Sequence, residues 1–289
     1  MSTQVSKSVI KRAQKLLGVV ADGVWGNKSK QALIDYQRKN LLVADGILGP
    51  KTLEKMGILD TDTCLYNKLG IEKRYLSKDQ YITSDVYVKN EYLILHHTAG
   101  WNNPFDVISG WENDSCGRIA TEFVIGGQNI KNGDKSYDGR IVQAFPEGCQ
   151  GYHIGSTKSQ FLNLHSVGIE MCNFGYLTES NRTYTGALAD PNQVCVLSEP
   201  FRGYTHWHKY SDDQLKALRK LILYIADRDE IDVRAGLIER IQKNPKTAFD
   251  YSEDIASGKI KGMFSHGNIR SDKFDVYPQP ELIDMLLTL

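Results

Sequence analysis

Cysteine is scarce in this sequence and follows no pattern. The 289 residues include five cysteines, which is an odd number, and none of them forms a CxxC pair. A small fold stapled by disulfides is therefore not expected. Scattered, unpaired thiols favour synthesis in a reducing cytosol.

An excess of charge of either sign is also lacking, as is any long apolar run. Lysine plus arginine and aspartate plus glutamate both number 35. A neutral chain argues against nucleic acid or an anionic membrane surface as the main partner. The first seven residues, Met1 to Lys7, contain no apolar leader, and no segment reaches the length of a membrane span. We therefore expect a protein made in the cytoplasm without a signal peptide and without stable membrane association. A substrate outside the membrane would require separate delivery.

The N-terminal part contains a repeat. The segment from Asp22 to Ser29 and the segment from Asp45 to Thr52 both read DGxxGxK[ST], 23 residues apart. Asp-Gly is turn chemistry, because glycine adopts positive φ and the aspartate side chain bonds nearby backbone N–H groups. Helical periodicity surrounds both loops. The apolar faces predict three short helices and contain Val9, Ile10, Ala13, Leu16 and Leu17, then Ala32, Leu33 and Tyr36, then Leu53 and Met56.

This three-helix segment, together with Gln14 and the pair Tyr36-Gln37, resembles the peptidoglycan-binding module of the PG_binding_1 type. The resemblance implies that residues 1–60 form a domain that binds peptidoglycan. The candidate binding residues are those of the two turns, Asp22, Gly23, Asp45 and Gly46.

The remainder of the chain has the pattern of an α/β domain. Residues 61–85 are polar and without a strong period, so we expect a linker there. Residues 86–289 then interleave apolar strands with helices, which predicts a mixed central sheet flanked by helices. The expected strands lie at 92–95, 122–125, 141–145 and 166–171, and the expected helices begin at Ser211, Arg234 and Pro280. Residues 176–210 are typical of a long surface excursion.

Residues able to support metal chemistry occur near the ends of these elements. Two neutral imidazoles and one carboxylate with an open fourth position form a catalytic zinc site. His266, Asp275 and either His96 or His97 could supply these ligands. Successive side chains on a strand point to opposite faces, so only one of His96 and His97 is expected to reach the ion.

Four segments in this order resemble the Amidase_2 family of N-acetylmuramoyl-L-alanine amidases. They are Leu95-His96-His97-Thr98, Gly151-Tyr152-His153-Ile154-Gly155, Ser166-Val167-Gly168-Ile169-Glu170 and the stretch from His266 to Asp275. The resemblance implies a zinc amidase fold that cleaves the amide between N-acetylmuramic acid and L-alanine. It further implies that Zn²⁺ is held by His96, His266 and Asp275, with Glu170 and Lys273 catalytic.

The resemblance also places His153 in the substrate cleft, without a ligand role. Two features depart from the family pattern. Lys273-Phe274-Asp275 is followed by Val276-Tyr277 where a Pro-Gly pair is frequent, and the strand at 120–123 has no tyrosine. The base is then expected to be Glu170, with Glu122 as the poorer candidate.

Several alternatives remain open at this point. His206 and His208 could form a second metal pair, and Cys116 could serve as a thiol nucleophile. The role expected from the resemblance is that of a phage endolysin, bacteriolytic and monomeric. A tail-associated or injection-system enzyme, a host wall-remodelling amidase and a non-catalytic peptidoglycan receptor are the rivals.

Overall fold

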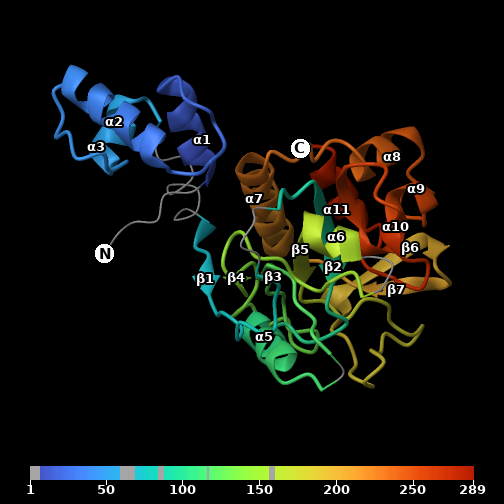
Figure 1. Cartoon of the computed structure of the whole chain (residues 1–289). Helices are drawn as coiled ribbons and strands as arrows, with labels where there is room; N and C mark the ends of the chain where they lie inside the picture. The colour runs from blue at the N-terminus through green and yellow to red at the C-terminus, as the bar shows by residue number, and fades with distance from the viewer. Residues whose placement is uncertain (1–6, 59–68, 84–87, 116, 156–159) are drawn as a thin grey trace. The chain divides into compact units, whose positions relative to one another are not determined.

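The computed structural model describes residues 7–58, 69–83, 88–115, 117–155 and 160–289. The chain divides into two compact units. The smaller unit holds the three N-terminal helices, and the larger covers Gly70–Ala226 and Glu230–Leu289. Figure 1 shows the smaller unit in blue. Its helices are α1 (Lys7–Leu16), α2 (Asn27–Lys39) and α3 (Pro50–Lys55).

The three predicted helices of the smaller unit are confirmed, and they enclose a core of their own. Val9, Ala13 and Leu33 are almost fully buried in it. Leu16 was expected on the buried face of the first helix, but 58% of it is exposed. It is the last residue of α1, where the chain turns toward the first loop.

One buried glutamine holds each Asp-Gly loop. The Gln14 side chain accepts the backbone N–H of Gly23 at 2.8 Å and donates to Asp22 Oδ1 at 2.9 Å. The same contacts recur in the second loop, with distances of 2.9 and 3.0 Å, for Gln37, Gly46 and Asp45. Both loop glycines have positive φ, which explains the repeated Gly after Asp.

The larger unit is built on a mixed sheet of six strands in the order β1-β4-β3-β5-β2-β8. Only the β3–β4 pair is antiparallel. The strands are β1 (Glu72–Lys73), β2 (Tyr92–His97), β3 (Phe123–Ile125), β4 (Ile141–Gln143), β5 (Ser166–Met171) and β8 (Gly262–Ser265). The predicted fold class is therefore confirmed, and β1 and β8 are strands that the sequence did not predict.

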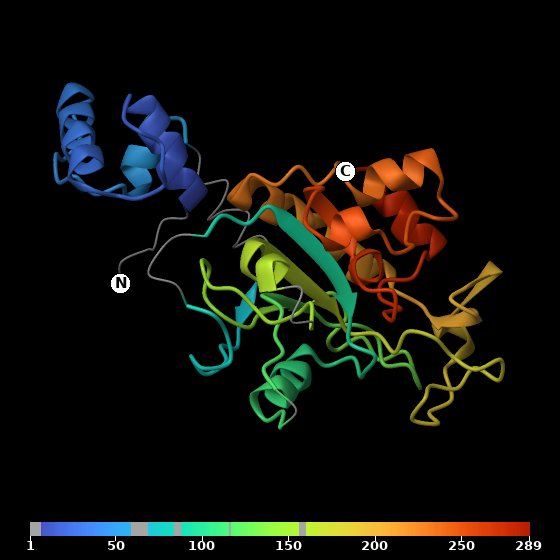
Figure 2. The ribbon, with the colours of Figure 1, turned by 45° about the vertical axis from the view of Figure 1, so that its right-hand side comes forward.

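Helices flank this sheet. They are α5 (Pro104–Glu112), α6 (Gln160–His165), α7 (Asp212–Asp229), α8 (Leu237–Lys243), α9 (Glu253–Ala256), α10 (His266–Ile269) and α11 (Pro280–Leu286). In both views α6 and α7 lie on opposite sides of β2 and β5 (Figures 1 and 2). Tyr92 and Ile94 of β2 pack in one apolar cluster with Leu162 of α6 and Phe264 of β8. His96 continues this face of β2, since alternate residues of a strand point the same way.

Sequence signals account for the ends of the longest helix. The Ser211 hydroxyl accepts the N–H of Gln214 at 3.0 Å and so caps α7, as its position predicts. The helix ends at Asp229, and the C-cap residue Glu230 adopts the left-handed conformation.

The excursion at 176–210 contains a second, two-stranded sheet. A 3-10 turn (Pro191–Gln193) leads into β6 (Val194–Phe201), which pairs antiparallel with β7 (Tyr204–His208). Arg202 and Gly203 form the two-residue turn, and both have positive φ. The loops from 176 onward lie near the end of β2 in Figure 2, in yellow.

Residues 70–83 differ from the expected linker. Arg74 and Leu76 donate backbone N–H groups to the β4 edge, and Leu76 and Tyr81 are buried in the core of the larger unit. These apolar residues are too widely spaced to show a period.

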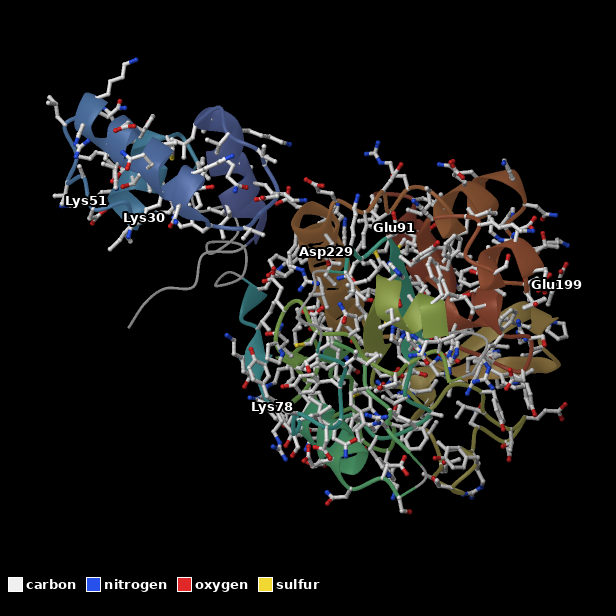
Figure 3. All side chains as sticks on the ribbon, viewed as in Figure 1. Lys30, Lys51, Lys78, Glu91, Glu199 and Asp229 are labelled. Atoms are coloured by element: carbon white, nitrogen blue, oxygen red, sulfur yellow. The ribbon has the colours of Figure 1, made fainter. Side chains whose placement is uncertain are left out.

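Charged side chains such as Lys30, Lys51, Lys78 and Glu199 lie at the surfaces of the two units (Figure 3). None of the described helices has the length and apolar character of a membrane span.

Candidate metal centre

Three parallel strands bring the candidate residues to one edge of the sheet. β2 lies between β5 and β8, and His96 is the register partner of Glu170 on β5. His266 directly follows the last residue of β8. Because the carboxyl ends of parallel strands meet at the same edge, these three residues converge from segments far apart in the sequence.

A local cap orients the second histidine. The Ser265 hydroxyl accepts the N–H of Asn268 at 3.2 Å, and the Asn268 side chain accepts the N–H of Ser265 at 3.0 Å. This capping box starts α10 at His266. The Asn268 amide also donates to Ala248 O at 2.9 Å, so the turn bearing His266 is held from both sides.

The atoms His96 Nδ1, His266 Nδ1 and Asp275 Oδ2 form a nearly equilateral triangle. The two nitrogens are 3.1 Å apart, and they lie 3.2 and 3.0 Å from the carboxylate oxygen. All three residues are buried. Among the described residues, they are the group of histidine, cysteine and acidic side chains that could hold a metal ion.

The triangle fits a cation better than it fits hydrogen bonds among its own members. An ionised carboxylate offers only lone pairs, and two imidazole nitrogens 3.1 Å apart cannot both point a proton at each other. A cation among the three atoms satisfies all of them at once. Zinc ligands at about 2.0–2.1 Å in tetrahedral geometry lie roughly 3.3 Å from one another, close to the separations found here.

The protonation states also suit a metal ligand set. Burial, followed by the nearby His266, lowers the pKa of His96 to about 4, so its ring is neutral at neutral pH. Burial by itself would raise the pKa of Asp275, but His266 and His96 together hold it well below its usual range. Neutral imidazole and ionised carboxylate are the forms that bind divalent metals.

Glu170 and Lys273 border the cluster. Glu170 is 9% exposed, and burial followed by the charge of Asp275 raises its pKa well above the ordinary value, while Lys273 acts in the opposite direction. Lys273 is half-buried and lies two residues before Asp275. A buried carboxyl and a partly exposed ammonium thus lie within electrostatic range of the same ligand cluster.

The paired histidines separate as the strand geometry predicts. His97 points away from the ligand triangle and bonds through Nδ1 to the Tyr210 hydroxyl at 2.8 Å.

His153 was expected to meet substrate, but its two ring nitrogens lie 2.9 Å from His96 Nε2 and 2.9 Å from Ser166 Oγ. Neither nitrogen is left for a substrate. Ser166 opens the motif at 166–170, and the sequence by itself predicts no role for it.

The hairpin turn supports the loop between the second and third ligands. The Arg202 guanidinium donates to Ser271 O and, at 3.2 Å, to Gly267 O. Arg202 belongs to none of the motifs recognised in the sequence. An arginine before glycine between two aromatic-rich stretches marks a tight turn, but nothing in the sequence says what the side chain reaches.

The other candidate residues lie elsewhere or are occupied within the fold. Asp22 and Asp45 are engaged by Gln14 and Gln37, so in this structure they shape the loops. The Glu122 carboxylate accepts from Gln143 Nε2 at 3.0 Å. His206 bonds to its neighbour Thr205, and His208 accepts the N–H of Phe174. Cys116 lies outside the described residues, and within them the cysteines are free: Cys149, Cys172 and Cys195.

Two families match the two parts of the chain. N-acetylmuramoyl-L-alanine amidase (Amidase_2) matches residues 87–260, which is more than half of the chain. The chain belongs to this amidase family. The matched range includes His96, His153 and Glu170 and ends before His266. The peptidoglycan-binding domain family (PG_binding_1) matches residues 10–56 of the smaller unit.

Solved structures similar to this chain include amidases and the catalytic domain of XlyA. The catalytic domain of XlyA is 12% identical over 75% of this chain and 97% of its own, with a TM-score of 0.42. The amidase LysC from Clostridium intestinale URNW is 16% identical over 76% and 97%, with a TM-score of 0.41. AmiD from E. coli, solved with a muropeptide, is 19% identical over 54% and 55%, with a TM-score of 0.32. In the comparison with curated proteins, nothing matches.

Proposed function

We propose that this amidase is a zinc enzyme that hydrolyses the amide between the lactyl group of N-acetylmuramic acid and L-alanine of the stem peptide. One observation carries the zinc assignment: His96 Nδ1, His266 Nδ1 and Asp275 Oδ2 converge within 3.0–3.2 Å in a buried cluster. The family supports the substrate.

His96, His266 and Asp275 would hold the zinc, which would supply Lewis-acid chemistry: a lowered pKa for a water and polarisation of the amide carbonyl. The protein's own residues carry the protons. Glu170, the register partner of His96, takes a proton from the attacking water and passes it to the leaving amine nitrogen. A raised pKa suits this double role, because the carboxyl must both accept and return the proton. Lys273 stabilises the negative charge that develops on the carbonyl oxygen.

The smaller unit is proposed to hold the enzyme on its insoluble substrate. Its match to the peptidoglycan-binding domain supports this role, and its separate core supports its treatment as a domain of residues 1–60. The loops shaped by Asp22-Gly23 and Asp45-Gly46 remain the proposed contact region. Tethering raises the effective concentration of the catalytic unit at the wall.

The biological role that these two parts support is that of an endolysin, because a wall-binding part joined to a wall-cutting part suits lysis of intact walls. A tail-associated wall-degrading enzyme would combine the same parts. A non-catalytic peptidoglycan receptor would not need Glu170 and Lys273 beside a complete ligand triangle.

Digestion of purified peptidoglycan tests the proposed reaction. Mass spectrometry should find stem peptides with a free L-alanine amino terminus and glycan strands of unchanged length. New reducing sugar ends would instead indicate a glycosidase. Cuts within the stem peptide would indicate a peptidase, for which Cys116 was the candidate nucleophile, and a thiol alkylator should then abolish activity.

A further inference from the structure

A chain of buried polar groups leads away from the first candidate ligand. His96 Nε2 lies 2.9 Å from His153 Nδ1, and His153 Nε2 lies 2.9 Å from Ser166 Oγ. The Ser166 hydroxyl in turn contacts the backbone oxygen of Leu162 in α6. His96, His153 and Ser166 are all buried.

The end of this chain fixes the direction of every bond in it. A backbone carbonyl only accepts, so the Ser166 hydroxyl proton is donated to Leu162 O. The Ser166 oxygen must then accept from His153 Nε2–H. A neutral His153 has its lone pair on Nδ1 and accepts from His96 Nε2–H. The proton of neutral His96 is therefore on Nε2, and its Nδ1 lone pair faces Asp275 and His266.

Ile154, the residue after His153, favours the corresponding tautomer of His266. His266 Nε2 lies 3.4 Å from the carbonyl oxygen of Ile154. Since this oxygen only accepts, it favours a proton on Nε2 and a bare Nδ1. The backbone N–H groups of His153 and Ile154 both donate to Asn163 Oδ1, at 3.0 and 2.9 Å, so the segment itself is held in place.

The strand β5 is shaped for this arrangement. A Cβ on Gly168 would lie 3.0 Å from the His153 ring and 2.7 Å from Thr121 Cγ2, so only glycine leaves the ring room. Ser166, Gly168 and Glu170 alternate along one face of the strand. Ser166 accepts the hydrogen bond from His153 Nε2, Gly168 leaves space for the His153 ring, and Glu170 borders the ligand triangle.

We propose that His153 and Ser166 are positioning residues that fix the tautomer of His96, with the Ile154 carbonyl acting likewise on His266, so that both Nδ1 lone pairs face Asp275. This inference rests on the proposed metal site and extends it. Partners of metal-bound histidines commonly act this way, and losing one typically costs 10–100-fold in metal affinity.

The first test needs no variant and no activity. Long-range ¹H–¹⁵N spectra of the folded full chain, with and without diamagnetic Zn²⁺, distinguish the two tautomers of each histidine. We expect His96 and His153 both to carry the proton on Nε2. Assigned spectra with the His96 proton on Nδ1 in the metal-free protein would overturn the proposal.

Variants test the effect on the ligand set, with Co²⁺ absorption as the measure of affinity. His153→Phe keeps a ring but removes the acceptor, so Co²⁺ should bind about 10–100-fold more weakly. His153→Asn can place an amide oxygen near the Nδ1 position and should recover part of this loss. Ser166→Ala removes only the hydroxyl that accepts from His153 Nε2 and should weaken Co²⁺ binding less than His153→Phe.

Ser211→Ala is the matched control, because it deletes another buried hydroxyl at the cap of α7. It should lower thermal stability and leave Co²⁺ affinity unchanged. Equal affinity in folded His153→Phe and wild type would refute the proposal, as would equal losses in Ser166→Ala and Ser211→Ala. Failure of the wild type to bind Co²⁺ would refute the metal site itself, whereas bound metal with an inactive enzyme would refute only the proposed reaction.

Discussion

Replacement of Gln37 should unfold the second loop of the smaller unit. The Gln37 side chain is 1% exposed, and its oxygen accepts the backbone N–H of Gly46. Its two amide protons are shared among three acceptors, Asp45 Oδ1, Ile47 O and Thr52 Oγ1. At about 1 kcal/mol net for each of the two donated protons and the one accepted bond, Gln37→Ala should cost roughly 3 kcal/mol. Units of about 50 residues are only marginally stable, so this loss should unfold the smaller unit at 37 °C.

Gln31→Ala on the same helix is the matched control. Gln31 is exposed, and its side-chain hydrogen bond to Asp35 Oδ1 is long at 3.3 Å. It should behave like the wild type. The assay compares sedimentation with purified cell walls and turnover of a soluble muropeptide. Gln37→Ala should lose wall binding and keep soluble turnover. If both variants bind walls equally well, the glutamine does not hold the loop.

Three further outcomes follow from the larger unit. Asp275→Ala should lower zinc affinity more than 100-fold, because it removes a ligand. Asp275→Cys should retain the metal, because thiolate also binds zinc. Equal zinc content of Asp275→Ala and wild type in metal analysis would contradict this prediction. Glu170→Gln should keep metal and fold yet reduce kcat about 10²-fold or more, with Glu122→Gln close to wild type, and the reverse order of the two rates would identify a different base. Burial lowers the pKa of His97 to about 4 and that of His208 to about 3. Both values lie below the pKa near 6.5 that histidine has in the unfolded chain. The unfolded chain therefore binds more protons, and the free energy of unfolding falls as the pH drops below about 6.5. At pH 5 this amounts to roughly 2 kcal/mol per histidine, and urea midpoints that are equal at pH 7.5 and 5 would contradict it.

The sequence predicts those parts of the fold that depend on local pattern. Apolar runs and the Ser211 cap locate β2, β5 and α7, because burial and capping act within a few neighbouring residues. The four residues of β8 lie beside a lysine-rich stretch and give no such signal. Residues 70–83 join the sheet through widely spaced apolar side chains, which leaves no period to detect.

The candidate ligands could be named in advance, because strand ends and family motifs mark them. Their supporting contacts could not. His153 meets His96 across 57 positions of sequence, and Arg202 reaches Gly267 across 65. Such pairs depend on how strands and loops are placed in space, and a single sequence records no trace of that placement. The motif at 166–170 does carry a usable signal, since its serine, glycine and glutamate alternate on one face.

Zinc titration of the chelated enzyme tests the central claim most directly. The full chain is stripped of metal and mixed with purified peptidoglycan, and zinc is added while free L-alanine amino termini are measured. We predict no release before addition and full activity at about one zinc per chain. Undiminished release of L-alanine termini from the exhaustively chelated protein would contradict the assignment of His96, His266 and Asp275 as the catalytic metal site.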